Sequence, residues 1–285
     1  MANPPPIPIL PSVSALAGSC DAWISDIWGV LHNGVAAFPA ASAACQRFRR
    51  GGGVIVLLSN APRPAPSVIA QLDGLGVPRA AYDGIVTSGD LTRRLIGAEK
   101  SPRVFHIGPD RDRAIFDGLG VALVEEAEAR LVVCSGLWND DTETPDDYRA
   151  LLTRLAARKL PMICGNPDIV VERGPQLVYC AGALAEVYEA VGGKVVYAGK
   201  PYLPAYKMAF EAIATAAGRK VPRQRILAIG DGLKTDIKGA AAAGLRSLFI
   251  ASALHVNGAF NAAVLAKLFK QHPAPPIAAQ KALVW

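Results

Sequence analysis

The chain has 285 residues, of which 51% are hydrophobic and 19% are charged, and its formal net charge is +6. At about 150 residues per domain this length suggests two domains, and the apolar content supports a sizeable core, which excludes a disordered chain. No apolar run reaches the roughly 20 residues that a transmembrane helix requires. The first residues lack the basic and apolar regions of a signal peptide, so we expect a cytoplasmic protein that does not contact the membrane.

The basic residues do not predict nucleic-acid binding. Their densest patch, 47–50, lies at the end of a predicted helix, where cations interact favourably with the helix dipole. A nucleic-acid site would need a longer basic stripe with interleaved aromatic residues, which is missing. The five cysteines are scattered singly, which predicts reduced, mostly buried thiols and excludes a disulfide framework or a zinc cage.

Strands and helices are predicted to alternate at both ends of the chain. Residues 1–18 form a proline- and alanine-rich arm, followed by predicted strands at 22–27, 54–58 and 84–87 with helices at 40–50 and 67–75 between them. The pattern returns with a helix at 205–217, a strand at 225–230, another helix and a strand at 247–251. Uninterrupted apolar strands alternating with helices are typical of a parallel sheet covered on both faces.

The middle of the chain is predicted to be a separate α/β domain, 98–194, inserted into a first domain made of 19–97 and 195–285. Its predicted strands lie at 104–107, 131–134, 162–164 and 177–180, and its predicted helices at 111–119, 145–159 and 183–191. The long helix at 145–159 has acidic residues in its first turn and basic residues in its last, as the helix dipole favours.

Polar residues directly follow several of these strands. Asp26, Ser59 and Asp231 each come just past a strand, and the carboxyl ends of parallel strands form the usual ligand site of such sheets. Asp236 follows Asp231 by five residues, and Lys200 stands between a glycine and a proline. We therefore expect these side chains to converge.

This combination points to phosphoryl transfer. Clustered carboxylates repel one another unless a divalent cation neutralises them, and hard oxygen ligands suit Mg²⁺. A carboxylate such as Asp26 can serve as the nucleophile and form an aspartyl-phosphate. Lys200 and the metal would offset charge on the phosphoryl oxygens, and Ser59 would donate a hydrogen bond to one of them.

In these segments, which include Asp26-Ile27-Trp28-Gly29-Val30-Leu31 and Gly230-Asp231-Gly232, the sequence resembles the haloacid dehalogenase-like (HAD) superfamily. The resemblance runs from about residue 20 to 255 and is strongest to its class IIA branch of NagD-like and 4-nitrophenylphosphatase-like enzymes. It implies a Rossmann-like core with an inserted α/β cap of the C2 type. Because caps of that branch commonly dimerise, a homodimer through the cap is a further expectation.

The resemblance also implies roles for individual residues. Asp26 matches the nucleophile and a metal ligand, and the backbone carbonyl of Trp28 would be a second ligand. Asp231 matches the acidic metal ligand and Asp236 the acid that completes the metal shell. Residues that match the phosphate- and substrate-binding positions, or lie in the cap loop that faces the substrate, are Ser59, Asn60, Lys200, Asn166 and Asp168.

The pattern departs from the family at position 28. Family phosphatases place there an Asp that protonates the leaving oxygen and later activates water, and this chain has Trp28, whose indole N–H only donates and hardly titrates. General acid–base catalysis is typically worth about 10²–10⁴-fold. Three interpretations follow. The protein is a phosphatase acting on small phosphorylated metabolites, either with good leaving groups or with another acid, such as His32. Alternatively, it performs different chemistry of the phosphonatase or dehalogenase kind, or it is a regulatory protein that binds a phosphometabolite without turnover.

Trp138, in the predicted cap, is a residue that could stack on a substrate or pack in the domain.

Overall fold

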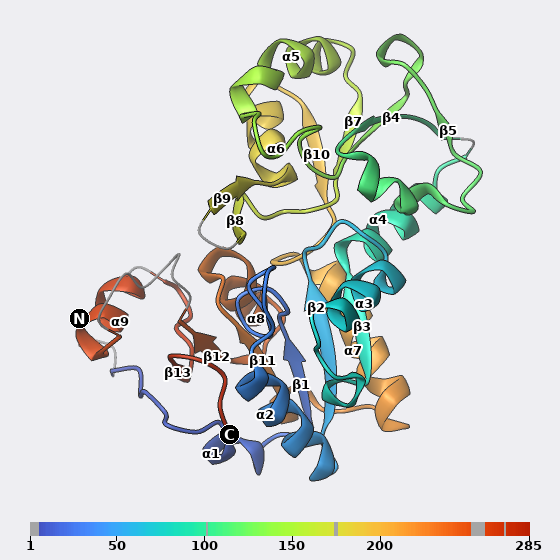
Figure 1. Cartoon of the computed structure of the whole chain (residues 1–285). Helices are drawn as coiled ribbons and strands as arrows, with labels where there is room; N and C mark the ends of the chain where they lie inside the picture. The colour runs from blue at the N-terminus through green and yellow to red at the C-terminus, as the bar shows by residue number, and fades with distance from the viewer. Residues whose placement is uncertain (1–5, 101, 174–175, 252–259, 271) are drawn as a thin grey trace. The chain divides into compact units, whose positions relative to one another are not determined.

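The computed structural model describes residues 6–100, 102–173, 176–251, 260–270 and 272–285 (Figure 1). The chain divides into two compact units. The first consists of residues 1–58, 71–85 and 206–285, and the second of residues 59–70 and 86–205. The predicted boundaries at 98 and 194 stay predictions.

The first unit is built on a parallel sheet with the strand order β13-β12-β11-β1-β2-β3. Its strands are β1 (Ala22–Ser25), β2 (Val54–Ser59), β3 (Gly84–Thr87), β11 (Ile226–Gly230), β12 (Arg246–Ile250) and β13 (Ala278–Gln280). In register, Ser25 lies between Ile229 of β11 and Leu57 of β2, so these three strands end side by side. Every residue of β1 and β11 is buried, which is why these strands are apolar without alternation.

Helices follow the strands as the sequence predicts. The α-helices associated with this sheet are α1 (Ser14–Ala17), α2 (Pro39–Arg50), α3 (Ala65–Gly74), α7 (Leu203–Ala217), α8 (Lys238–Ala242) and α9 (Ala262–Leu268). The stripe that α2 buries includes Phe48, whose ring stacks on Trp23 of β1 at 3.9 Å between centroids. The basic residues 47–50 end this helix as predicted.

The predicted N-terminal arm lies along the last strand of this sheet. Residues 1–5 of it are outside the described residues. Ile9 forms a β-bridge with Ala279, and the backbone N–H of Leu10 donates to the carbonyl of Ala279 at 2.9 Å. The arm therefore continues the sheet beyond β13 before the short α1.

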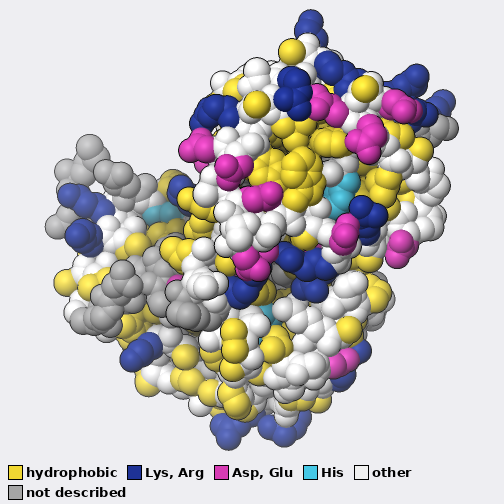
Figure 2. All heavy atoms as spheres, turned by 45° about the horizontal axis from the view of Figure 1, so that its top comes forward, with side chains coloured by type: hydrophobic (Ala, Val, Ile, Leu, Met, Phe, Trp, Pro, Cys, Tyr) yellow, Lys and Arg dark blue, Asp and Glu magenta, His cyan; other side chains and the backbone are white. Residues whose placement is uncertain are grey.

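The second unit contains its own parallel sheet, with the order β10-β7-β6-β4-β5. The strands are β4 (Arg103–Ile107), β5 (Ala122–Leu123), β6 (Leu131–Cys134), β7 (Pro161–Cys164) and β10 (Lys194–Tyr197), and a separate hairpin pairs β8 (Val170–Arg173) with β9 (Gln176–Tyr179). The α-helices of this unit are α4 (Ser88–Gly97), α5 (Arg149–Ala157) and α6 (Ala181–Ala190). On the face shown in Figure 2, basic and acidic side chains are interspersed. Within the second unit, Asp140 forms ion pairs with both Arg111 and Arg173.

One helix prediction for this unit is wrong. The predicted helix at 111–119 is instead a 3₁₀ segment, η2 (Asp110–Phe116), which ends before Gly118 and Gly120, both with positive φ. The predicted strand at 177–180 is present as β9, one residue earlier, and pairs with β8 in the separate hairpin. The predicted helix at 145–159 begins as a 3₁₀ turn, η4 (Pro145–Tyr148), and continues as α5.

The predicted α/β fold with a parallel-sheet core and an additional domain is confirmed. All five cysteines are buried and free, as expected. Desolvation raises the pKa of Cys45 and of Cys134 to about 12, so these thiols stay protonated and act as small apolar side chains. Within the described ranges, every helix is too short or too polar to span a lipid bilayer.

Candidate active site

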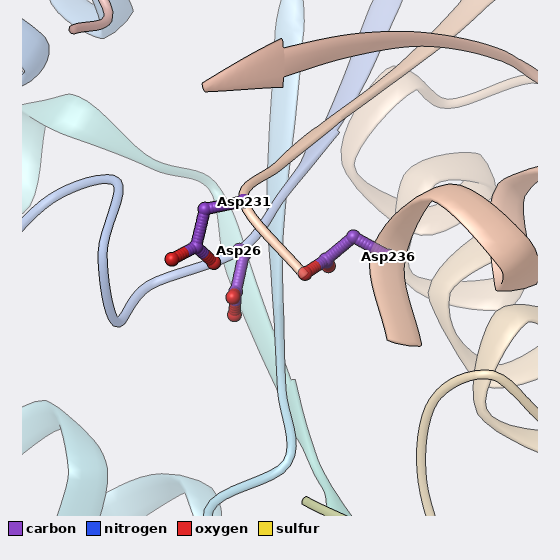
Figure 3. A group of neighbouring side chains, drawn as sticks. All are labelled: Asp26, Asp231 and Asp236. Carbon is purple, nitrogen blue, oxygen red and sulfur yellow. The ribbon is translucent and has the colours of Figure 1, made fainter. Parts of the chain in front are cut away.

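Three carboxylates gather at the carboxyl ends of β1 and β11. Asp26 follows β1, Asp231 follows β11, and Asp236 lies on the π-helical turn η6 (Leu233–Ile237). One oxygen of each lies within 4.8 Å of the others (Figure 3). Asp26 and Asp236 are buried and Asp231 is half-buried. The predicted convergence of these three acids is therefore present in the structure.

Glycines make room for this cluster. A Cβ on Gly29, whose φ is +79°, would lie 2.2 Å from Asp231 Oδ2, and a Cβ on Gly230 would lie 2.2 Å from Asp236 Cγ. Backbone groups also hold the acids: the N–H of Ile27 donates to Asp26 Oδ1 at 2.7 Å and that of Gly232 to Asp236 Oδ2 at 3.1 Å. The loops are shaped around carboxylates at these positions.

The donor set fits a divalent metal ion. Three negative groups this close, two of them withdrawn from water, are strongly unfavourable without a counter-charge. Carboxylate oxygens are the ligands that hard cations such as Mg²⁺ prefer. Among the described residues, this is the one group of three His, Cys, Asp or Glu side chains close enough to share an ion.

Trp28 is half-buried and packs against the loop that follows the first strand. Gly34 has φ +84°, and a Cβ there would lie 2.4 Å from Cζ2 of the indole. The ring of His32 meets the indole edge-on, with 5.0 Å between centroids, and the backbone N–H of Gly29 donates to the His32 carbonyl at 2.8 Å. We call residues 27–38 the Trp28 loop.

His32 has a packing role in this loop. Its side chain is 1% exposed, and its Nδ1 accepts the backbone N–H of Gly34 at 2.9 Å. Nδ1 is thus an acceptor, and the proton of the neutral ring is on Nε2. The ring connects the two ends of the turn that encloses Trp28.

The residues predicted to bind phosphate form a second connected group. Asn60 lies at its centre: its amide nitrogen donates to Asp168 Oδ1 at 3.0 Å and to the carbonyl of Lys200 at 3.2 Å, and its oxygen accepts the N–H of Lys200 at 2.7 Å. Asn166 Oδ1 in turn accepts the N–H of Asp168 at 3.1 Å. Ser59, which is 7% exposed, is the last residue of β2, and its Oγ accepts a backbone N–H two residues later.

These contacts give Asn60 a positioning role. Three of its hydrogen bonds, together with one from Ser88 Oγ at 3.3 Å, occupy both ends of its amide. A Cβ on Gly199 would lie 2.5 Å from Asn60 Oδ1, so the glycine before Lys200 allows this close approach. Lys200 itself is 2% exposed and therefore needs such a defined polar environment.

The sequence analysis missed a third group, at the carboxyl ends of β4 and β6. Ser135 Oγ lies 2.9 Å from His106 Nε2 and also hydrogen-bonds to Asp112, which is 3% exposed. Burial raises the pKa of Asp112 and lowers that of His106 to about 4. Burial also lowers the pKa of Arg63, which Asp112 opposes. The signal was available, because Ser135 directly follows a predicted strand.

Models of known protein families match two stretches of the chain. A model described as haloacid dehalogenase-like hydrolase matches residues 23–122, and one described as HAD-hydrolase-like matches 197–278. A solved haloacid dehalogenase-like hydrolase from Brucella suis is 49% identical, with a TM-score of 0.86 over 96% of this chain and 100% of that chain. The chain belongs to the haloacid dehalogenase-like hydrolases. The family expected from the sequence is confirmed, and with it the assignment of this chain to the hydrolase class of enzymes.

Two further relatives carry specific names. D-glycerol 3-phosphate phosphatase of Mycobacterium tuberculosis is 31% identical over 236 residues, which are 76% of this chain and 62% of that protein. The chain thus spans less than two thirds of the length of this curated relative. NagD of E. coli K-12 has a TM-score of 0.66 at 21% identity over 93% of this chain and 97% of that chain, and shares its fold.

Proposed function

We propose that this protein is a Mg²⁺-dependent phosphatase that hydrolyses a small phosphorylated metabolite through an aspartyl-phosphate at Asp26. The observation that carries the proposal is the cluster of Asp26, Asp231 and Asp236 at adjoining strand ends, within 4.8 Å of one another. A relative named as a phosphatase supports the same reaction type. The cytoplasmic location and a homodimer through the proposed cap, residues 98–194, belong to this proposal.

In the proposed reaction, Asp26 attacks the phosphorus atom and the bond to the leaving oxygen breaks. Asp26, Asp231, Asp236 and the carbonyl of Trp28 would hold Mg²⁺, which would supply positive charge to offset that of the phosphoryl oxygens. Ser59 ends the strand beside β1, where its hydroxyl donates to a phosphoryl oxygen.

Lys200 supplies a second positive charge to the same phosphoryl group. Asn60, the residue after Ser59, holds the backbone of Lys200 through two hydrogen bonds, so the backbone from which the lysine side chain projects is fixed next to Asn60. Asn166 and Asp168 are the proposed substrate-side residues of the cap, and Asp168 is tied to the same Asn60.

The presence of Trp28 in place of an acid supports a second candidate function. Because an indole neither donates a proton to a leaving alcohol nor removes one from water, binding of a phosphometabolite without turnover is the alternative. Phosphonatase- or dehalogenase-like chemistry, which does not require protonation of an alcohol leaving group, is a third candidate function.

Hydrolysis of 4-nitrophenyl phosphate by the full-length protein with Mg²⁺ tests the proposal. Turnover should disappear in Asp26→Asn, because the amide replaces the proposed nucleophilic carboxylate. Calorimetric Mg²⁺ affinity should fall in Asp231→Asn, because this variant removes one negative charge from the cluster. Retained turnover in Asp26→Asn would contradict the nucleophile. Absence of turnover with tight Mg²⁺-dependent binding of a phosphate ester would favour a binding protein without turnover. Release of halide, or of phosphate from a phosphonate, would favour dehalogenase- or phosphonatase-like chemistry.

A further inference from the structure

The structure shows that Trp28 is built into its loop and does not hang freely beside the nucleophile. The missing Cβ of Gly34 leaves space that the indole fills, and the ring of His32 covers its edge. A backbone bridge between Trp28 and His32 closes the turn. The position two residues after Asp26 is thus occupied by a fixed aromatic ring.

The Trp28 loop offers no other side chain for proton transfer. His32 is its one titratable residue, and that ring is 1% exposed, with Nδ1 accepting the Gly34 N–H and one edge against Trp28. The three carboxylates nearby are the nucleophile and the proposed metal ligands, so each already has another role in the proposed reaction. The leaving group therefore departs from phosphorus without a proton from this loop.

We infer that the substrates are phosphoryl compounds whose leaving group departs as a stable anion: acyl phosphates, or phosphate esters of phenols and enols. This substrate class rests on the proposed phosphatase function. Conjugate acids of such groups have pKa values from about 4 for a carboxyl to about 10 for a phenol. An alkoxide from a sugar or glycerol phosphate is nearly as basic as hydroxide, whose conjugate acid has a pKa of about 16, and requires a general acid.

Atoms and charges balance without that acid. In the first step an Asp26 oxygen bonds to phosphorus, and the electron pair of the broken P–O bond leaves with the anionic leaving group. In the second step water attacks phosphorus, the electron pair of the P–O bond to Asp26 returns to the carboxylate, and the proton of the water passes to solvent. The products are the leaving-group anion and inorganic phosphate.

The experiment measures kcat/KM of the full-length protein with Mg²⁺ for 4-nitrophenyl phosphate, phenyl phosphate, acetyl phosphate and glycerol 3-phosphate. Without a general acid, kcat/KM should follow leaving-group pKa, falling by about 10²-fold or more from 4-nitrophenyl to phenyl phosphate. Acetyl phosphate should be a good substrate and glycerol 3-phosphate the poorest. Trp28→Asp should reduce the first ratio to below about tenfold by accelerating the phenyl ester.

Trp28→Asn is the matched control, because it opens the same space without supplying a proton. It should keep the steep dependence, as should Trp28→Phe, which retains an aromatic ring. A wild-type kcat/KM that is independent of leaving-group pKa would overturn the substrate class while leaving the phosphatase proposal intact. Absence of Asp26-dependent turnover on all four compounds would overturn the proposed function and the substrate class with it.

Discussion

Packing of Trp28 against Gly34 predicts a measurable coupling between the two residues. An alanine at Gly34 would adopt φ +84° and place its Cβ 2.4 Å from Cζ2 and 2.6 Å from Cη2 of the indole. The backbone conformation alone costs about 1 kcal/mol, and displacing the ring adds about 1–3 kcal/mol. Gly34→Ala should therefore lower the free energy of unfolding by about 2–4 kcal/mol.

Two comparisons isolate the ring. Gly52 has φ +88° and nothing within 4 Å of its absent Cβ, so Gly52→Ala should show the backbone cost alone. In a Trp28→Ala background, Gly34→Ala should likewise cost only about 1 kcal/mol. Urea unfolding followed by far-ultraviolet circular dichroism measures all four variants. Equal costs of Gly34→Ala with and without the indole would refute the enclosed position of Trp28.

Three other predictions concern pH, the metal and the phosphate group. Because burial lowers the pKa of His106 from 6.5 to about 4, the unfolded chain binds a proton more readily, and stability should fall by about 2 kcal/mol between pH 7 and pH 5. Urea unfolding of His106→Gln at these two pH values should lack this component. Gly230→Ala should displace Asp236 and weaken calorimetric Mg²⁺ binding by tenfold or so. Asn60→Ala should lower kcat/KM by about tenfold or more, because the backbone of Lys200 loses two hydrogen bonds to the Asn60 side chain.

The sequence predicted the central strands well, because their apolar runs reflect burial on both faces. The bounds of β1, β2 and β11 differ from the prediction by one or two residues, and β3, an edge strand, also lies where it was predicted. The strands that were missed lie at sheet edges or are very short: β10 and β13 end their sheets, and β10 alternates exposed and half-buried residues. An edge strand needs less apolar sequence and is therefore harder to distinguish from a loop.

The candidate site was predictable as far as strand ends and charge allow. Asp26 and Asp231 follow buried strands, and parallel strands end at a common edge. The placement of Asp236 depends on a π-helical turn, which composition does not indicate. The hydrogen bonds of Asn60 to Asp168 and Lys200 span 108 and 140 residues of sequence, and such partners follow from tertiary structure alone.

The glycines around the cluster bear on which candidate function the site favours. Gly29 and Gly230 leave room for Asp231 and Asp236, so the loops hold carboxylate oxygens within 4.8 Å of one another. Gly34 leaves room for an indole, so the same region accommodates a bulky residue at the position of the missing acid. A site shaped in both respects supports attack by Asp26 and does not support protonation of the leaving group. The site therefore favours a reaction whose leaving group needs no proton over an ordinary phosphatase that has merely lost its general acid.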